Sequence, residues 1–190
     1  MLTKRQGKRW SSLLMNTTSL RYATLCGITE EEIHNQLGEA IAQLSEACGI
    51  SKNKCYKRLR ENYDGYRFHH KAVGVYNPFS LLTALSRNEF GSYRFETGTP
   101  TILVEVLKRT DYSLSQLSNE EATADLLGNL DDMENSPIAL LYQSGYLTIK
   151  DYDERFGTYM LGFPNREVEE GFTRYLVPYL SSTTSVIYIK

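Results

Sequence analysis

The residues of this chain that could do chemistry do not have the spacing of a P-loop. That motif requires GxxxxGK[ST], because its glycines aim backbone N–H groups at phosphate and its lysine neutralises charge. The only Gly-Lys pair is Gly7-Lys8. Leu2 stands where the first glycine belongs, and Arg9 stands where Ser or Thr belongs. The sequence therefore predicts that no phosphate-binding loop of this type forms here.

Histidine and acidic side chains also lack the spacing of a metal or catalytic site. His69 and His70 are adjacent, neighbours of that kind do not share a helix face, and no Cys or further His stands at zinc-ligand spacing. Asp151, Asp153 and Glu154 are not followed by EF-hand spacing, so they indicate a solvated turn. We predict no catalytic residue, no metal ligand and no enzymatic activity for the chain by itself.

A basic segment, residues 52–71, is the candidate for binding nucleic acid. Seven Lys and Arg side chains oppose Glu61 and Asp64, which leaves a local charge of +5. Aromatic residues lie between the cations, a mixture that can follow phosphates and stack on bases. The alternative, which we favour, is a solvated helix face followed by a loop anchored by its aromatic rings. The candidate contacts for weak nucleic-acid binding are Lys52, Lys54, Lys57, Arg58, Arg60 and Arg67.

Composition gives no other indication of a polyanionic or membrane partner. The chain has 190 residues, a net charge of −2 and 41% hydrophobic residues. No apolar run approaches 18 residues and no signal-peptide pattern occurs, so we expect a cytoplasmic protein without membrane contact. The three cysteines, Cys26, Cys48 and Cys55, lack CxxC spacing and are expected to be reduced thiols.

Helix-capping patterns divide most of the chain into helices. Thr29 with Glu32 forms a capping box, and the apolar periodicity that follows predicts one helix that ends near Gly49. Ser51 can cap a second helix. The pairs Asn77-Pro78, Thr99-Pro100 and Ser136-Pro137 each place a capping residue before a proline that suits the first helical position. A weaker capping box, Ser118 with Glu121, predicts a helix over 122–127.

The segment from Ser136 to Leu180 has the order of a winged-helix-like module. A helix that ends at Gly145 is followed by a strand at 146–149, a polar turn at 151–157 and a returning strand at 159–163. Asn165 can then cap a last helix. Residues 137–180 carry a net charge of −2, which disfavours a phosphate-contacting role for this module.

These patterns predict a mainly α fold with a small antiparallel β-hairpin. The predicted organisation is a poorly ordered basic leader at 1–21, a helical lid-like part at 22–110, a connecting segment at 111–135, the winged-helix-like module at 136–180 and a tail at 181–190.

Five stretches, taken as an ordered set over residues 22–172, resemble the AAA-ATPase-like proteins that are common in gut Bacteroidetes. Proteins of that family often carry a C-terminal PD-(D/E)XK nuclease-like domain. The matching stretches are YATLCGITEEEI (22–33), ENYDGYRF (61–68), VYNPFSLL (75–82), FGSYRFETGTPTILVEVL (90–107) and PIALLYQSGYLTIKDYDERFGTYMLGFPNREVEEGF (137–172).

The resemblance implies the part of a P-loop ATPase that follows the nucleotide core. Family members carry the P-loop, a Walker-B strand and a sensor strand before the CGITEEE stretch, and the nuclease motif includes a Glu-x-Lys pair. None of these patterns occurs here. We therefore expect a non-catalytic fragment of a longer protein, produced from a truncated or disrupted gene. The motif positions that the resemblance leaves without a role are Tyr63, Asp64, Gly65, Tyr66, Asn77, Pro78, Thr97 and Gly98.

The same resemblance limits the expected ligands and partners. We expect no cofactor, with ATP and Mg²⁺ bound only where another chain supplies the core. The expected partners are a separate ATPase core or a second copy of this chain. The alternative functions are a nucleic-acid-binding module and a protein-interaction module, the latter using an exposed apolar surface.

Overall fold

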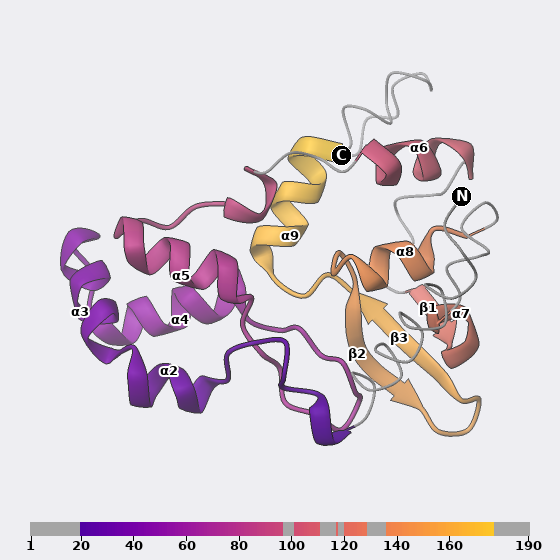
Figure 1. The fold of residues 1–190 in the computed structure, drawn as a ribbon, viewed down its shortest axis with the longest axis horizontal. Helices are drawn as coiled ribbons and strands as arrows, with labels where there is room; N and C mark the ends of the chain where they lie inside the picture. Colours follow the sequence, from indigo (N-terminus) through magenta and orange to yellow (C-terminus); the bar gives the residue numbers. More distant parts are fainter. Residues whose placement is uncertain (1–19, 97–100, 111–116, 118–119, 129–135, 177–190) are drawn as a thin grey trace, which may run out of the picture.

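A computed structural model describes residues 20–96, 101–110, 117, 120–128 and 136–176, and the fold it shows is mainly helical with a small antiparallel sheet. Helices α2 to α5 group on one side, and the sheet with α6 to α8 lies on the other (Figure 1). Helix α9 lies between these two groups. Thr97, Gly98, residues 1–19 of the predicted leader, most of the connecting segment and the predicted tail fall outside the described residues.

The helical part begins where the capping patterns predict. The Thr29 hydroxyl accepts the Glu32 N–H at 3.2 Å, and the Glu32 carboxylate accepts the Thr29 N–H at 2.8 Å. Ser51 and Asn77 cap the two later helices through the N–H groups of Lys54 and Ser80. The helices are α2 (Glu30–Gln36), α3 (Gly38–Ala47), α4 (Lys52–Tyr63) and α5 (Pro78–Arg87).

One long helix from Glu30 was the expectation, and it was wrong. The chain bends at Leu37, which has φ −111°. This residue is both the C-cap of α2 and the N-cap of α3. Gly38 follows directly, and glycine is among the weakest helix formers. The break still keeps the predicted apolar positions on the inner side. The N-terminal core consists of Ile33, Ile41, Leu44, Cys55, Leu59, Tyr63, Tyr76, Leu81, Ala84, Leu85 and Tyr93.

The C-terminal part confirms the predicted hairpin and adds a strand. Strands β2 (Thr148–Asp153) and β3 (Thr158–Gly162) are antiparallel, and β1 (Glu120–Thr123) pairs with the other edge of β3. The sheet order is therefore β1-β3-β2. Residues 122–123, predicted as helix, belong to β1, and α7 starts only at Ala124. Pairing with β3 spans about 40 residues of sequence, so the local capping pattern could not reveal it.

The C-terminal part, which contains the segment predicted to be a winged-helix-like module, has a polar turn between β2 and β3. Three helices complete it before the hairpin: α6 (Thr101–Arg109), α7 (Ala124–Gly128) and α8 (Ile138–Gln143). Helix α6 was predicted to belong to the lid-like part, but Leu103 and Leu107 enter the C-terminal core. The short α9 (Arg166–Gly171) and the π-helical turn η5 (Phe172–Leu176) follow β3.

The C-terminal core draws on both parts of the chain. Tyr66, Val75 and Phe95 come from segments that flank α4 and α5, yet they pack with the winged-helix-like module. The core consists of these three residues with Leu103, Leu107, Leu117, Ala122, Leu127, Ile138, Leu141, Tyr146, Leu147, Ile149, Leu161, Val168 and Phe172. In the part of the chain that the structure describes, no helix is both long and apolar enough to cross a bilayer.

Candidate functional site at the junction of the two cores

The junction between the two cores contains most of the motif positions whose role the sequence left open. Helix α4 ends at Tyr63, and Asp64 then takes an extended conformation with ψ −175°. Gly65 has φ +95°, a backbone conformation that side-chain-bearing residues rarely adopt. A Cβ at this position would lie less than 3.0 Å from the Pro164 carbonyl oxygen, so the two backbones meet there without an intervening side chain.

Asn165 holds this contact with a single side chain. Its Oδ1 accepts the Val168 N–H at 3.1 Å and so caps α9, as predicted. Its Nδ2 donates to the Asp64 carbonyl oxygen at 2.7 Å. The start of α9 is therefore fixed directly to the end of α4, 101 residues earlier in the chain. The sequence predicts the cap, but it gives no signal for the second bond.

An isolated antiparallel β-bridge beside Gly65 belongs to the same junction. Tyr66 and Val75 exchange backbone hydrogen bonds of 3.2 and 2.9 Å. The Asn77 N–H donates to the Tyr63 carbonyl at 2.9 Å, while the Asn77 side chain caps α5 ahead of Pro78. Tyr63 is buried in the N-terminal core and Tyr66 in the C-terminal core. Tyrosines three residues apart thus anchor the segment in both cores.

A buried acid forms the other side of the junction. Glu167, on α9, is only 3% exposed and accepts the Arg94 backbone N–H at 3.1 Å. The Arg94 guanidinium donates to the Ser144 carbonyl and lies over the Tyr146 ring at 4.9 Å. One residue thus connects α9, the end of α8 and the turn before β2. Sequence reasoning missed Glu167, because an acid in a first helical turn is ordinarily solvated.

Burial raises the pKa of the Glu167 carboxyl, and the hydrogen bond from the Arg94 N–H opposes that rise in part. Burial likewise raises the pKa of Asp64, whose side chain approaches the backbone of Gly74. Among the described residues, no three His, Cys, Asp or Glu side chains gather to hold a metal ion. The hydrogen bonds of Asn165, Glu167 and Arg94 thus connect the two cores at the junction.

The Glu167 burial gives a prediction about pH. A carboxyl group with a folded-state pKa above its ordinary value of 4.5 stabilises the fold fully below that value, and this contribution is lost as pH rises through the folded-state pKa. We expect Glu167→Gln, whose amide oxygen can still accept the Arg94 N–H, to flatten the fall in unfolding free energy above pH 4.5. Urea denaturation between pH 4 and 8 measures it. Glu169→Gln, on the exposed side of α9, is the control, and an equal flattening in both variants would contradict the assignment.

Three of the predicted nucleic-acid contacts on α4 have local partners. Lys57 lies 3.7 Å from Glu61, and Arg60 lies 2.5 Å from Glu30. Arg58 stacks over the Phe90 ring at 4.2 Å. These α4 cations therefore have local partners, which favours the solvated-face interpretation.

The remaining predicted contacts are separated along the chain. Lys52 and Lys54 are exposed at the start of α4, whereas Arg67 follows its end. A helix of 12 residues spans about 18 Å. The Arg67 N–H donates to the Thr148 hydroxyl at 2.7 Å, which places this cation beside β2. The Arg67 end of the basic segment therefore lies next to the hairpin, whereas Lys52 and Lys54 lie at the far end of α4.

Helix α8 directly precedes the hairpin, and its composition does not suit phosphate contacts. Its sequence, IALLYQ, contains no Lys or Arg, and Ile138, Ala139 and Leu141 are buried. Phosphate contacts dominate the affinity of proteins for nucleic acid. The geometry therefore gives this helix a packing role.

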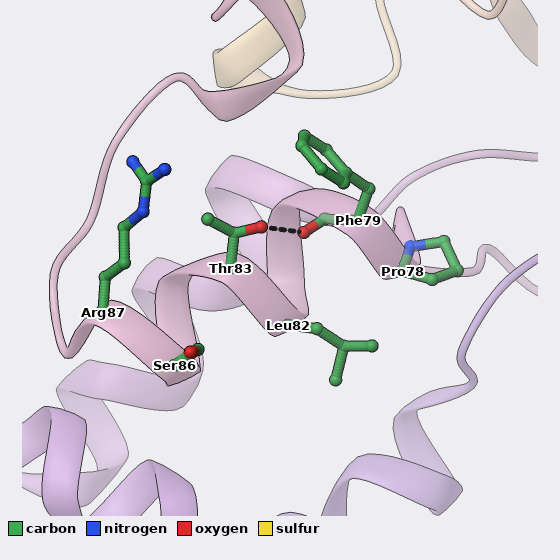
Figure 2. Close-up of a pocket in the computed structure, with 6 residues that line it drawn as sticks. All are labelled: Pro78, Phe79, Leu82, Thr83, Ser86 and Arg87. Carbon is green, nitrogen blue, oxygen red and sulfur yellow. Dashed lines mark hydrogen bonds between the residues drawn. The ribbon is translucent and has the colours of Figure 1, made fainter. Parts of the chain in front are cut away.

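An exposed apolar groove runs along α5. Phe79 is 51% exposed and Leu82 is 47% exposed, although both lie on a helix whose other side is buried. A shallow, open pocket on α5 is lined by Pro78, Phe79, Leu82, Thr83, Ser86 and Arg87, and Figure 2 shows the Phe79 and Leu82 side chains pointing away from each other.

Comparison with known proteins gives a limited context for this geometry. No family model matches the chain, and no solved structure matches it. A curated relative is 36% identical over 171 residues. It is named "Uncharacterized protein in vnfD 5'region" and comes from Azotobacter chroococcum mcd 1. The match covers 88% of this chain but 31% of the relative, so the chain spans less than a third of that relative's length.

Proposed function

We propose that this chain is a non-catalytic connecting unit of a P-loop ATPase, equivalent to its helical lid and winged-helix-like portion. The observation that carries the proposal is the junction. Two stretches of the resemblance, ENYDGYRF and GFPNREVEEGF, are far apart in sequence yet meet through Gly65, Pro164 and Asn165. A rigid junction between two cores suits a connecting part that transmits the movement of one domain to the next.

The chemistry of the chain agrees with a connecting role. Pro164, Asn165 and Glu167 are buried at the junction, and among the described residues no three His, Cys, Asp or Glu side chains gather to hold a metal ion. Phosphoryl transfer depends on positioning and on neutralising phosphate charge, and the sequence has no P-loop for either. The partner we propose is an ATPase core, for which the α5 groove offers an apolar contact surface.

The chain by itself should not bind nucleotide. We expect Mg-ATP to leave its melting temperature unchanged. A ligand that did bind the folded chain and was present at 100 times its Kd would stabilise the fold by about 2.7 kcal/mol, which the melting temperature would reveal. Differential scanning fluorimetry with Mg-ATP and with Mg²⁺ alone measures the effect. A rise with Mg-ATP only would contradict the proposal.

The Azotobacter relative provides the complementary test. At full length it should bind Mg-ATP if the matched segment belongs to a P-loop ATPase. A chimera in which residues of this chain replace the matched segment should keep ATP hydrolysis, and Asn165→Ala in that chimera should alter the rate. Failure of the full-length relative to bind Mg-ATP would overturn the proposal.

A further inference from the structure

Three aromatic rings from two distant segments stack on the face of the hairpin, and a fourth, Tyr159, lies against the last of them with an interplanar angle of 44°. The His69 and His70 rings lie 4.3 Å apart and the His70 and Tyr152 rings 4.4 Å apart, with interplanar angles of 22° and 23°. Tyr159 extends the stack from β3, 4.7 Å from Tyr152. All four rings are partly exposed. None therefore belongs to the fully buried part of the C-terminal core.

The loop that carries the two histidines is fixed to the sheet. The Thr148 hydroxyl accepts the Arg67 N–H at 2.7 Å and donates to the Arg67 carbonyl at 3.1 Å. The His69 Nδ1 accepts the Lys71 N–H at 3.0 Å, which sets the orientation of the outermost ring. Burial lowers the pKa of His69, with contributions from His70 and Lys71, and this favours the uncharged ring.

Cations border this stack, and the nearby acids are partly engaged in the turn. Arg67 and Lys71 are exposed on the loop, and Arg155 is exposed on the β2–β3 turn. The Asp153 carboxylate accepts the N–H groups of Arg155 and Phe156 at 2.8 and 3.1 Å. The Asp151 carboxylate accepts the Tyr152 N–H at 2.8 Å. Both acids are exposed, as is Glu154, so electrostatic attraction here is modest and ring stacking has to provide most of the affinity.

We propose that the stack of His69, His70, Tyr152 and Tyr159, bordered by Arg67 and Lys71, is a binding platform for single-stranded nucleic acid. Aromatic side chains stack on unpaired bases of any sequence, whereas the bases of a duplex are already stacked and paired. Cations beside the rings can follow the phosphates of the strand. Neither the connecting role nor the predicted contacts along α4 requires this site.

Fluorescence anisotropy with a labelled oligothymidylate, and with a duplex of equal length, tests the proposal. We expect micromolar or weaker binding that prefers the single strand. His69→Ala should weaken it about tenfold, while His69→Phe, which keeps a ring, should retain it. The Arg67→Ala plus Lys71→Ala pair should reduce the salt slope by about 1.4, since each contact to a single strand contributes about 0.7.

The matched control removes the same charge elsewhere. Lys52→Ala plus Lys54→Ala, at the opposite end of α4, should leave affinity and salt slope unchanged. Circular dichroism of each variant establishes that it is folded. If His69→Ala does not fold, the affinity of His69→Phe still tests the stacking role of the ring. Absence of binding at low salt, equal affinity for the duplex, or an equal loss in the α4 pair would overturn the proposal.

Discussion

Replacing Gly65 with alanine is expected to destabilise the fold more than any other single methyl addition at a glycine of the junction. The new Cβ would meet the Pro164 backbone carbonyl, and the residue would keep φ +95°. Positive-φ strain and overpacking each cost about 1–3 kcal/mol, so we expect a loss of about 3–5 kcal/mol. Urea denaturation at neutral pH measures the free energy of unfolding, and the melting temperature should fall by roughly 10 °C.

Two other glycines separate the contributions to this effect. Gly49 also has positive φ, +63°, but a Cβ there would contact nothing within 4 Å. Gly49→Ala should therefore show the backbone strain alone, about 1 kcal/mol. Gly38 is in α3 with open space around it, and Gly38→Ala should stabilise the fold slightly. A Gly65→Ala loss no larger than that of Gly49→Ala would show that the contact with Pro164 is not tight.

The helix starts at Glu30, Lys52 and Pro78 were predictable because capping is local physics. Thr29, Ser51 and Asn77 each satisfy N–H groups that lie two or three residues further along the chain. The β2–β3 hairpin was predictable for the same reason, since its two strands are separated by a short turn. The expectation of a mainly α fold with a small antiparallel sheet was therefore confirmed.

The features that the sequence did not reveal depend on partners far along the chain. Strand β1 becomes a strand because β3 lies beside it, and α6 packs with residues after position 117. The junction follows the same rule. Asn165 has the sequence pattern of a cap, but its bond to Asp64 exists only once both cores have docked. Likewise, the ring stack needs His70 from one segment and Tyr152 from another.

The segments around Gly65 and Asn165 are constrained both by their local turn conformations and by the close contact between them. Each local feature is ordinary by itself. The turn at residues 64–66 contains a positive-φ glycine, Gly65, and the turn at residues 164–165 contains the N-cap of α9, Asn165. Together they bring the two backbones close enough for the Asn165 side-chain amide to donate to the Asp64 carbonyl. Both turns therefore have a structural role in this chain.

Replacing Asn165 is the test that separates helix capping from the junction. Asn165→Ala removes the cap of α9, which costs about 0.5–2 kcal/mol, and leaves the Asp64 carbonyl without its donor, which costs about 1–3 kcal/mol. We expect a total loss of about 2–4 kcal/mol in the free energy of unfolding. Asn165→Asp keeps the oxygen that caps α9 but cannot donate to Asp64.

The aspartate variant therefore isolates the second bond, and Ser51→Ala isolates an ordinary cap. Ser51 caps α4 through the Lys54 N–H at 3.3 Å and is exposed, so its loss should cost about 1 kcal/mol. Urea denaturation of the three variants gives the comparison. If the junction bond contributes to stability, Asn165→Asp must be less stable than the wild type, despite its retained cap and its negative charge at a helix N-terminus. Wild-type stability for Asn165→Asp, with a loss for Asn165→Ala equal to that of Ser51→Ala, would reduce Asn165 to a simple cap and leave the contact between the two cores to the other residues of the junction.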